Sequence, residues 1–182
     1  MPGYGAGPGD HWFPWLQGSL VADGVAASVV ALPTPDAPVA HEWEAAVAAA
    51  LGAPGPGTWV VAHSLGGITT LRVLAALPEP WSLGGLVLVS GFTGPLNALP
   101  MLDGYLGADV DVERVRDHVA ERVMIRSDAD ELVPPSASDA LAARLVARRH
   151  VVPGAGHFLA DDGITALPTV RSALHRSERP PH

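Results

Sequence analysis

Short apolar runs alternate along the chain with longer stretches in which apolar residues recur at helical spacing. Each short run is rich in Val, Leu or Ala and is bounded by turn-forming or polar residues, which predicts a strand. The predicted strands cover residues 26–31, 58–62, 85–90, 122–126 and 150–152. The predicted helices cover residues 41–51, 65–77, 136–147 and 164–175.

This alternation of strands and helices predicts βαβ units and a mostly parallel sheet. Since crossover connections are right-handed, the expected α/β fold is a three-layer α/β/α sandwich. Reactive groups in such folds gather at the carboxyl ends of the strands. Candidate site residues should therefore come directly after a strand.

Length and composition narrow the class of protein. The 182 residues suit one domain, which we expect over residues 1–176, followed by a frayed tail over residues 177–182. A net charge of -8 without any basic run argues against nucleic acid and anionic membrane surfaces as partners. The chain has no cysteine, which excludes disulfides, thiolate catalysis and cysteine zinc sites.

Targeting signals are also absent from the sequence pattern. No stretch approaches the roughly 20 apolar residues of a spanning helix, and no basic region followed by an apolar region opens the chain. We therefore expect a cytoplasmic protein. All 11 basic residues are arginine, which together with abundant Ala, Gly and Pro is typical of a GC-rich bacterial genome.

The segment Val60-Val61-Ala62-His63-Ser64-Leu65-Gly66-Gly67 runs from a predicted strand into a predicted helix through a serine. A tight strand-to-helix turn projects its central side chain outward and needs small residues two positions to either side, here Ala62 and Gly66. Ser64 would then be a nucleophile at a helix N-terminus, with the Leu65 N–H as one donor to an oxyanion. The alternative is a serine that only caps the helix.

A serine nucleophile needs a base, and the base needs an orienting acid. In hydrolases of the α/β type the chain order is serine, acid, histidine. The fourth predicted strand is followed by Asp128 and Asp130, and the last one by His157 in a Gly-rich loop. By position both aspartates qualify as the acid. His63 is expected to point away from Ser64, whereas His11 lies close to the N-terminal glycine loop.

The motifs AHSLGG, SDADELVP and GAGHF, in this order, resemble those of small serine hydrolases of the retinoblastoma-binding protein 9 type, within the α/β-hydrolase superfamily. The opening PGYGAGPGDHWFPWL also resembles that group's first loop and first helix. The resemblance implies a compact α/β-hydrolase fold, a short cap, no cofactor and a Ser–Asp–His triad. It assigns Ser64, His157 and, through the D-x-x-x-P pattern ending at Pro134, Asp130 to that triad. By position, it also assigns the second oxyanion donor to the backbone N–H of Tyr4 or Gly5.

The chain departs from this pattern at its beginning. The family's first strand, an apolar run before the glycine loop, is missing, because the sequence opens at Met1. That strand is central in the family's sheet, and its loss leaves buried ladder groups unpaired. We expect that the assigned start omits it and that Met1 corresponds to a valine codon read as a start.

These residues predict a serine hydrolase that cleaves small or medium carboxylic esters or thioesters through an acyl-enzyme. The cap is expected over about residues 92–116. Its apolar residues either form an acyl pocket or only cover the sheet: Phe92, Leu96, Leu99, Met101, Leu102, Tyr105 and Leu106. The rival interpretations are a non-catalytic protein-binding module on a hydrolase scaffold, or a perhydrolase, acyltransferase or peptidase that uses the same triad.

Overall fold

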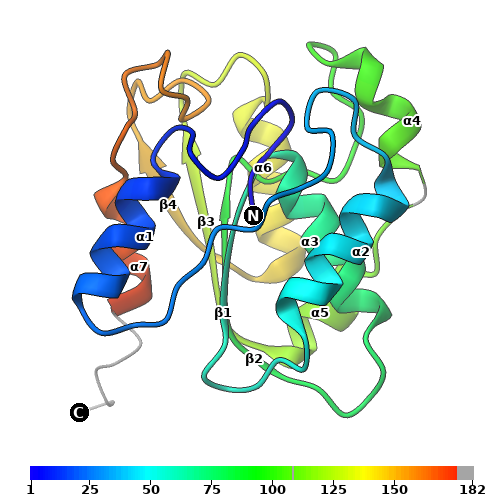
Figure 1. Cartoon of the computed structure of the whole chain (residues 1–182). Helices are drawn as coiled ribbons and strands as arrows, with labels where there is room; N and C mark the ends of the chain where they lie inside the picture. The colour runs from blue at the N-terminus through cyan, green and yellow to red at the C-terminus, as the bar shows by residue number, and fades with distance from the viewer. Residues whose placement is uncertain (108, 176–182) are drawn as a thin grey trace.

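The centre of the computed structural model, which describes residues 1–107 and 109–175, is a four-stranded sheet (Figure 1). Its strands lie in the order β1-β2-β3-β4, and every neighbouring pair is parallel. They are β1 (Trp59–His63), β2 (Leu83–Val89), β3 (Val119–Ser127) and β4 (Arg148–Val152). All carboxyl ends therefore meet at one edge, which is the upper edge in Figure 1.

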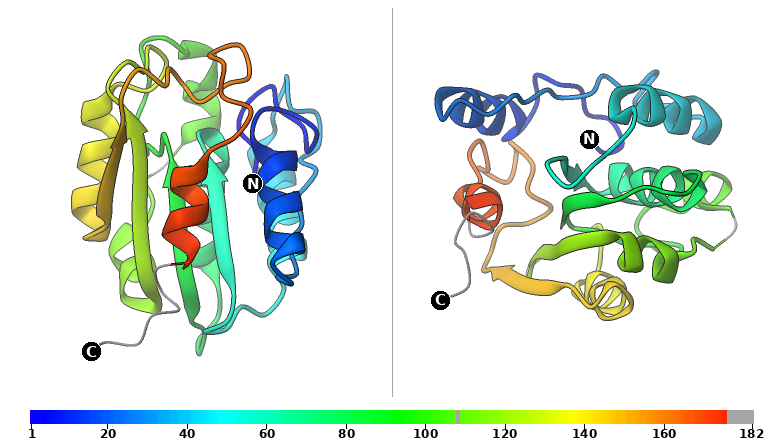
Figure 2. Two further views of the ribbon diagram at one scale, coloured as in Figure 1. Left: turned by 90° about the vertical axis from the view of Figure 1, so that its left-hand side faces the viewer. Right: turned by 90° about the horizontal axis from the view of Figure 1, so that it is seen from below.

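Helices cover both faces of this sheet (Figure 2). One side carries α1 (Phe13–Ala22) and α7 (Pro168–His175). The other side carries α2 (Ala40–Leu51), α3 (Leu65–Ala76), α5 (Val112–His118) and α6 (Pro135–Leu145). The predicted three-layer α/β/α arrangement is confirmed.

Strand β2 shows how the sheet divides the core. All seven of its residues are buried, as expected for a central parallel strand. Because side chains alternate between the two faces, Leu86 and Leu88 enter the cluster beneath α3, and Val87 and Val89 enter the cluster beneath α1 and α7. The continuous apolar run in the sequence thus reflects burial on both faces.

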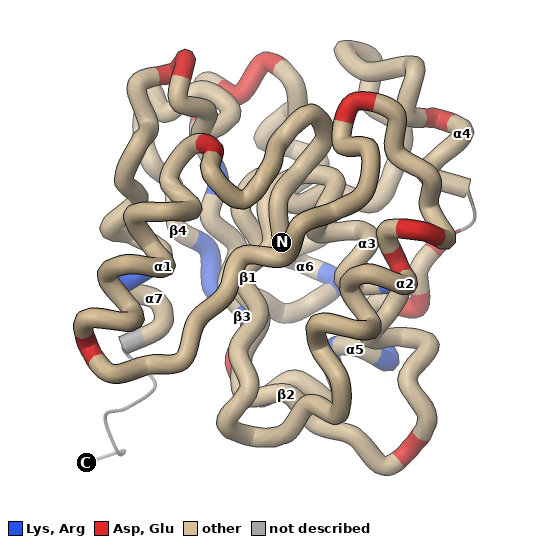
Figure 3. The backbone as a smooth tube through the Cα atoms, in the orientation of Figure 1, with Lys and Arg blue, Asp and Glu red and all other residues tan. Residues whose placement is uncertain are grey.

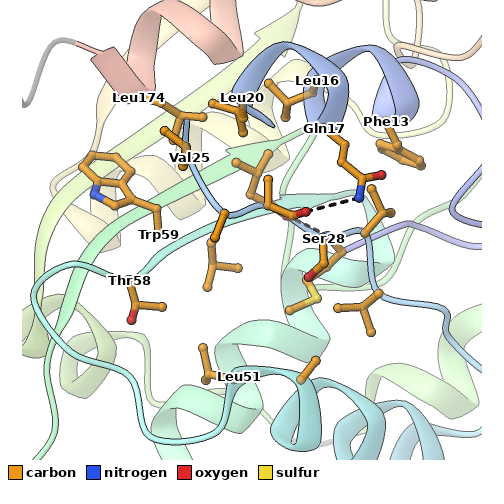
Figure 4. Close-up of a pocket in the computed structure, with 18 of the residues that line it drawn as sticks. Phe13, Leu16, Gln17, Leu20, Val25, Ser28, Leu51, Thr58, Trp59 and Leu174 are labelled. Carbon is orange, nitrogen blue, oxygen red and sulfur yellow. Dashed lines mark hydrogen bonds between the residues drawn. The ribbon is translucent and has the colours of Figure 1, made fainter. Parts of the chain in front are cut away.

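Four of the five predicted strands are confirmed, and the first one, residues 26–31, is wrong. That segment is extended but joins no ladder. It lies across a cavity of about 510 Å³ from the outer edge of β1, and Figure 4 shows Ser28 and Val25 on one wall and Thr58 and Trp59 on another. Without a strand at hydrogen-bonding distance, apolar extended residues cannot form a sheet.

Among the described residues, Met1 makes a strand-like contact with this outer edge. Its amino group donates to the carbonyl of Val61 at 2.7 Å, and the N–H of His63 donates to the carbonyl of Met1 at 3.0 Å. These two bonds bracket Met1 as a parallel neighbour would. In the part of the chain that the structure describes, the sheet begins at Trp59. The family's first strand, which would precede the glycine loop, is not found there.

The cap contains a short 3-10 helix, η1 (Pro100–Leu102), followed by α4 (Asp103–Leu106) and the beginning of α5. Five of its seven apolar residues are buried in the main core: Phe92, Leu96, Leu102, Tyr105 and Leu106. Met101 is exposed, with 64% of its surface accessible. Most of these residues therefore cover the core, whereas Met101, Leu102 and Tyr105 also line a crevice.

The closing helix is shorter than predicted. It begins at Pro168 rather than at residue 164, because turns occupy the preceding residues and proline is well suited to the first helical position. The predicted tail, residues 177–182, lies outside the described residues. Among the helices that are described, none combines the length and apolar character needed to cross a membrane.

Candidate active site

Ser64 occupies the turn between β1 and α3, with its backbone at φ 51° and ψ -124°. This positive φ is unusual for a residue with a side chain and costs on the order of 1–3 kcal/mol. The serine side chain makes no capping hydrogen bond to the helix. The interpretation of Ser64 as a plain helix cap is therefore wrong.

The N-terminal loop requires a small residue at Gly66, two positions after Ser64. A Cβ atom at Gly66 would collide with the backbone carbonyls of Pro2 and Met1. Ala62 is completely buried on the other side of the turn. The expectation of small flanking residues is confirmed. The segment that excludes a side chain at Gly66 is the opening loop rather than an adjacent strand or helix.

Asp130 and His157 meet at the carboxyl edge of the sheet. The Nδ1 atom of His157 lies 2.8 Å from Oδ2 and 3.0 Å from Oδ1 of Asp130. The side chain of His157 is only 7% exposed, and that of Asp130 only 2%. Burial by itself raises the pKa of Asp130, but hydrogen bonds from His157, from the Val133 N–H and from the Ser90 hydroxyl lower it overall. The carboxyl group is thus ionised and held in one orientation.

Ser90 is a partner that the sequence did not reveal. Its hydroxyl donates to Oδ2 of Asp130 at 2.7 Å, and its backbone N–H donates to the carbonyl of Ile125. Ser90 is fully buried and has φ 48°. A polar residue at the end of an apolar strand run was the available signal.

Asp128 serves a different purpose. Its Oδ1 accepts the N–H of Gly154 at 2.8 Å, at the beginning of the loop that carries His157. Asp162 binds the same loop from its other end, because its Oδ2 accepts the N–H groups of His157 and Leu159 at 2.8 and 3.0 Å. Of the two aspartates left open by the sequence, the structure brings Asp130 to the imidazole and uses Asp128 to hold the loop.

His63, which is expected to point away from Ser64, packs against His157. Its ring centroid lies 4.8 Å from that of His157, and its Nε2 lies 2.8 Å from the His157 carbonyl oxygen. His11 also faces this loop, because its Nδ1 accepts the N–H of Ala160 at 3.0 Å. Among the described residues, no hydrogen bond joins the Ser64 hydroxyl to the His157 ring.

The N-terminal loop approaches Ser64 closely. A Cβ atom placed on Gly3 would lie 3.0 Å from the Cβ of Ser64. The N–H of Gly5 donates to the carbonyl of Pro35 at 2.9 Å and is not available to a ligand. Of the two expected donors in this loop, Gly5 is therefore excluded and Tyr4 remains. Leu65 is the first residue of α3, where a backbone N–H has no partner within the helix.

A crevice of about 470 Å³ opens beside Tyr4. Its walls include Asp36 and Pro38 from the loop before α2, and Met101, Leu102 and Tyr105 from the cap. The cavity of about 510 Å³ behind β1 is a different space, and neither lining includes Ser64, Asp130 or His157. Within the described residues, no group of three or more His, Cys, Asp or Glu side chains could hold a metal ion.

The sequence profile of a family described as serine hydrolase matches residues 1–176. The chain belongs to the serine hydrolase family. This serine hydrolase is 39% identical over 172 residues to YdeN of Bacillus subtilis, which is named as a hydrolase; the match covers 94% of this chain and 90% of YdeN. The crystal structure of the B. subtilis ydeN gene product superposes with a TM-score of 0.93 at 38% identity, covering 97% of this chain and 95% of that one.

More distant structures share the fold of this serine hydrolase. A YdeN-like hydrolase from Pectobacterium atrosepticum gives a TM-score of 0.67 at 17% identity and covers 98% of this chain and 86% of that one. The non-heme bromoperoxidase BpoC of Mycobacterium tuberculosis gives 0.66 at 15% identity over 98% and 91%. At these identities the likeness concerns the α/β-hydrolase fold alone.

Proposed function

We propose that this serine hydrolase cleaves small or medium carboxylic esters or thioesters, with Ser64 as the nucleophile, His157 as the general base and Asp130 as the orienting acid. The observation that carries the proposal is the buried Asp130–His157 hydrogen bond at the strand edge where the strained Ser64 turn lies. Membership of the serine hydrolase family supports the same chemistry.

The Asp130 contact defines which nitrogen of His157 can act as the base. Since an ionised carboxylate only accepts, Nδ1 of His157 carries the proton and donates a hydrogen bond to Asp130. The other nitrogen, Nε2, then has a free lone pair for the Ser64 hydroxyl proton. As Ser64 Oγ bonds to the carbonyl carbon, its proton moves to Nε2, and the carbonyl π electrons become the oxyanion.

The oxyanion would accept hydrogen bonds from the backbone N–H groups of Leu65 and Tyr4. Collapse of this intermediate breaks the bond to the leaving alcohol or thiol, which takes the proton from His157. Water then attacks the acyl-enzyme, gives a proton to His157, and releases the carboxylic acid as Ser64 recovers its proton. Asp130 remains ionised throughout and stabilises the transient imidazolium.

The crevice beside Tyr4 suits a substrate of limited size. Its volume of about 470 Å³ lies at the small end of the usual range for ligand pockets, roughly 300–1,000 Å³. Figure 3 shows acidic residues along the upper edge of the molecule, where the strands end, and Asp36 lines the crevice itself. We therefore infer that neutral or cationic esters are better substrates than anionic ones.

The test is active-site labelling combined with a substrate panel. Purified protein is treated with a fluorophosphonate probe, the labelled peptide is identified, and p-nitrophenyl esters, thioesters and peptides are compared as substrates. We expect labelling of Ser64 and turnover of short esters, both lost in Ser64→Ala while the circular dichroism spectrum is unchanged. A wild-type protein that neither takes the probe nor turns over any member of the panel would support the non-catalytic binding module instead.

A further inference from the structure

His63 links the turn of Ser64, the proposed nucleophile, to the loop of His157, the proposed base. It precedes Ser64 in the chain, and its side chain reaches the backbone of His157, which is 94 residues further along. Only 1% of its surface is accessible. The contact is a hydrogen bond of 2.8 Å from the His63 Nε2 to the His157 carbonyl oxygen.

The partner of this bond determines the tautomer of His63. A carbonyl oxygen only accepts, so Nε2 must carry the hydrogen and Nδ1 is bare in the neutral ring. Nδ1 is buried and has no hydrogen-bond partner among the described residues. It faces the N-terminal loop, since a Cβ atom on Gly3 would lie 3.5 Å from it.

His63 is also kept uncharged. Burial lowers its pKa well below the ordinary value of 6.5, and the nearby imidazole of His157 lowers it further, which together outweigh the opposite effect of the hydrogen bond to the His157 carbonyl. This matters because the His157 ring becomes positively charged in the proposed mechanism. A charged imidazole 4.8 Å away would oppose that step, whereas a neutral one does not.

Resting on the proposed function, we infer that His63 is a positioning residue, a neutral donor that ties the His157 backbone to the nucleophile turn and so sets the approach of the His157 ring to Ser64. Asp128 and the Ser127 hydroxyl bind the flank of this loop at Gly154 and Ala155, and Asp162 accepts the N–H of His157 at 2.8 Å. The His63 bond acts on the carbonyl of His157 itself. Among these contacts it is the one that links His157 to the residue directly before Ser64.

The alternative is that His63 only fills space. Its ring lies 6.1 Å from Trp12 and 6.0 Å from Phe13, so it also packs against the beginning of α1. The two roles differ in what a substitution changes. Loss of packing lowers stability, whereas loss of the donor lowers the rate of the chemical step and leaves substrate binding alone.

The experiment compares His63→Gln with His63→Met, two side chains of nearly equal size. Glutamine keeps an N–H donor near the position of Nε2, and methionine has none. For p-nitrophenyl butyrate hydrolysis we expect His63→Gln to keep kcat within about threefold of wild type, and His63→Met to lose about tenfold to a hundredfold in kcat with KM within about twofold. Phe13→Leu is the packing control and should lower Tm with little change in kcat.

Equal kcat values for His63→Gln and His63→Met would overturn the positioning role, as would a loss confined to KM or Tm. If His63→Met does not fold, ¹⁵N NMR of the wild-type imidazoles decides instead. We expect His63 to stay neutral and protonated at Nε2 between pH 5.5 and 8, and a ring that titrates or carries the hydrogen on Nδ1 refutes the inference.

The labelling result separates this inference from the proposed function. A wild-type protein that does not react with the fluorophosphonate probe contradicts the proposed function. A wild-type protein that reacts, with His63→Met reacting at the same rate, contradicts only the role of His63.

Discussion

The Nδ1 atom of His157 lies within 3.0 Å of both carboxylate oxygens of Asp130, and the pair is almost completely buried. The same carboxylate accepts the Ser90 hydroxyl and the N–H groups of Leu132 and Val133. These bonds fix the carboxylate before any substrate arrives. An imidazole held in this way is prepared to accept a proton on its other nitrogen.

Asp130→Asn should lower kcat by about 10³- to 10⁴-fold, because the amide cannot balance the charge of the imidazolium or enforce its tautomer. Asp128→Asn is the matched control, because it removes a charge from the same loop while keeping an acceptor for Gly154. We expect less than a tenfold loss there. Steady-state hydrolysis of a p-nitrophenyl ester checks both, and a larger loss in the Asp128 variant would transfer the role of the acid to that residue.

Ser64→Gly should be more stable than Ser64→Ala by about 1 kcal/mol. Glycine adopts φ 51° without steric cost, whereas alanine keeps the strain of the turn. For a domain of this size the difference corresponds to about 2–4 °C in Tm. Thermal unfolding followed by circular dichroism measures it. Equal or reversed melting temperatures would show that the turn stores no such strain.

Gly66→Ala should destabilise the protein by about 1–3 kcal/mol and lower kcat, because the new methyl group displaces the Pro2 backbone and with it the loop of Tyr4. Gly67→Ala is the control one residue away. There the nearest atom to a new Cβ is Cδ2 of Leu88 at 3.5 Å, an ordinary contact, and alanine is the better helix former. Urea unfolding and esterase assays on both variants check this, and similar losses in the two would contradict it.

Acidification below pH 6.5 should destabilise the protein in part through His63. In the unfolded chain this ring takes up a proton near its ordinary pKa of 6.5, whereas the folded protein lowers its pKa well below that value. The unfolded state then binds more protons, so the free energy of unfolding falls as the pH falls, by up to about 1.4 kcal/mol per pH unit. The lowered pKa of His11 acts in the same direction.

His63→Gln removes one of these titrating groups. The free energy of unfolding in urea, measured at pH 7.5, 6.5 and 5.5, should therefore decrease less steeply in the variant than in wild type. Asp130 has a lowered pKa and contributes its own loss only below its ordinary value of 3.8, outside this window. Parallel curves for the two proteins would mean that His63 is protonated in the folded state as readily as in the unfolded one.

Ester charge should matter for turnover. The acidic residues around the strand ends repel an anionic acyl group, so p-nitrophenyl succinate should show a lower kcat/KM than p-nitrophenyl butyrate. Added salt screens this repulsion, with a Debye length of about 10 Å at 0.1 M, and should narrow the difference. A salt-independent ratio would attribute the preference to the shape of the crevice.

The sequence alone determined most of the fold and the order of the candidate chemistry. Periodicity located four strands and four of the helices, because each depends on local spacing and on the turn residues around it. The strand–Ser64–helix pattern was recognisable for the same reason. His157 and the acidic pair Asp128 and Asp130 were recognisable because reactive groups follow strand ends in a parallel sheet.

Tertiary structure alone decided which atoms meet. The family resemblance already favoured Asp130 over Asp128, but the contact of Asp130 with His157, the support from Ser90 and the bond that occupies the Gly5 N–H all depend on segments distant in the chain. The apolar run at residues 26–31 failed as a strand because a ladder needs a neighbour, which is not a local property. The contact of His63 with His157 could not be predicted for the same physical reason, since it is a bond to a carbonyl 94 residues away.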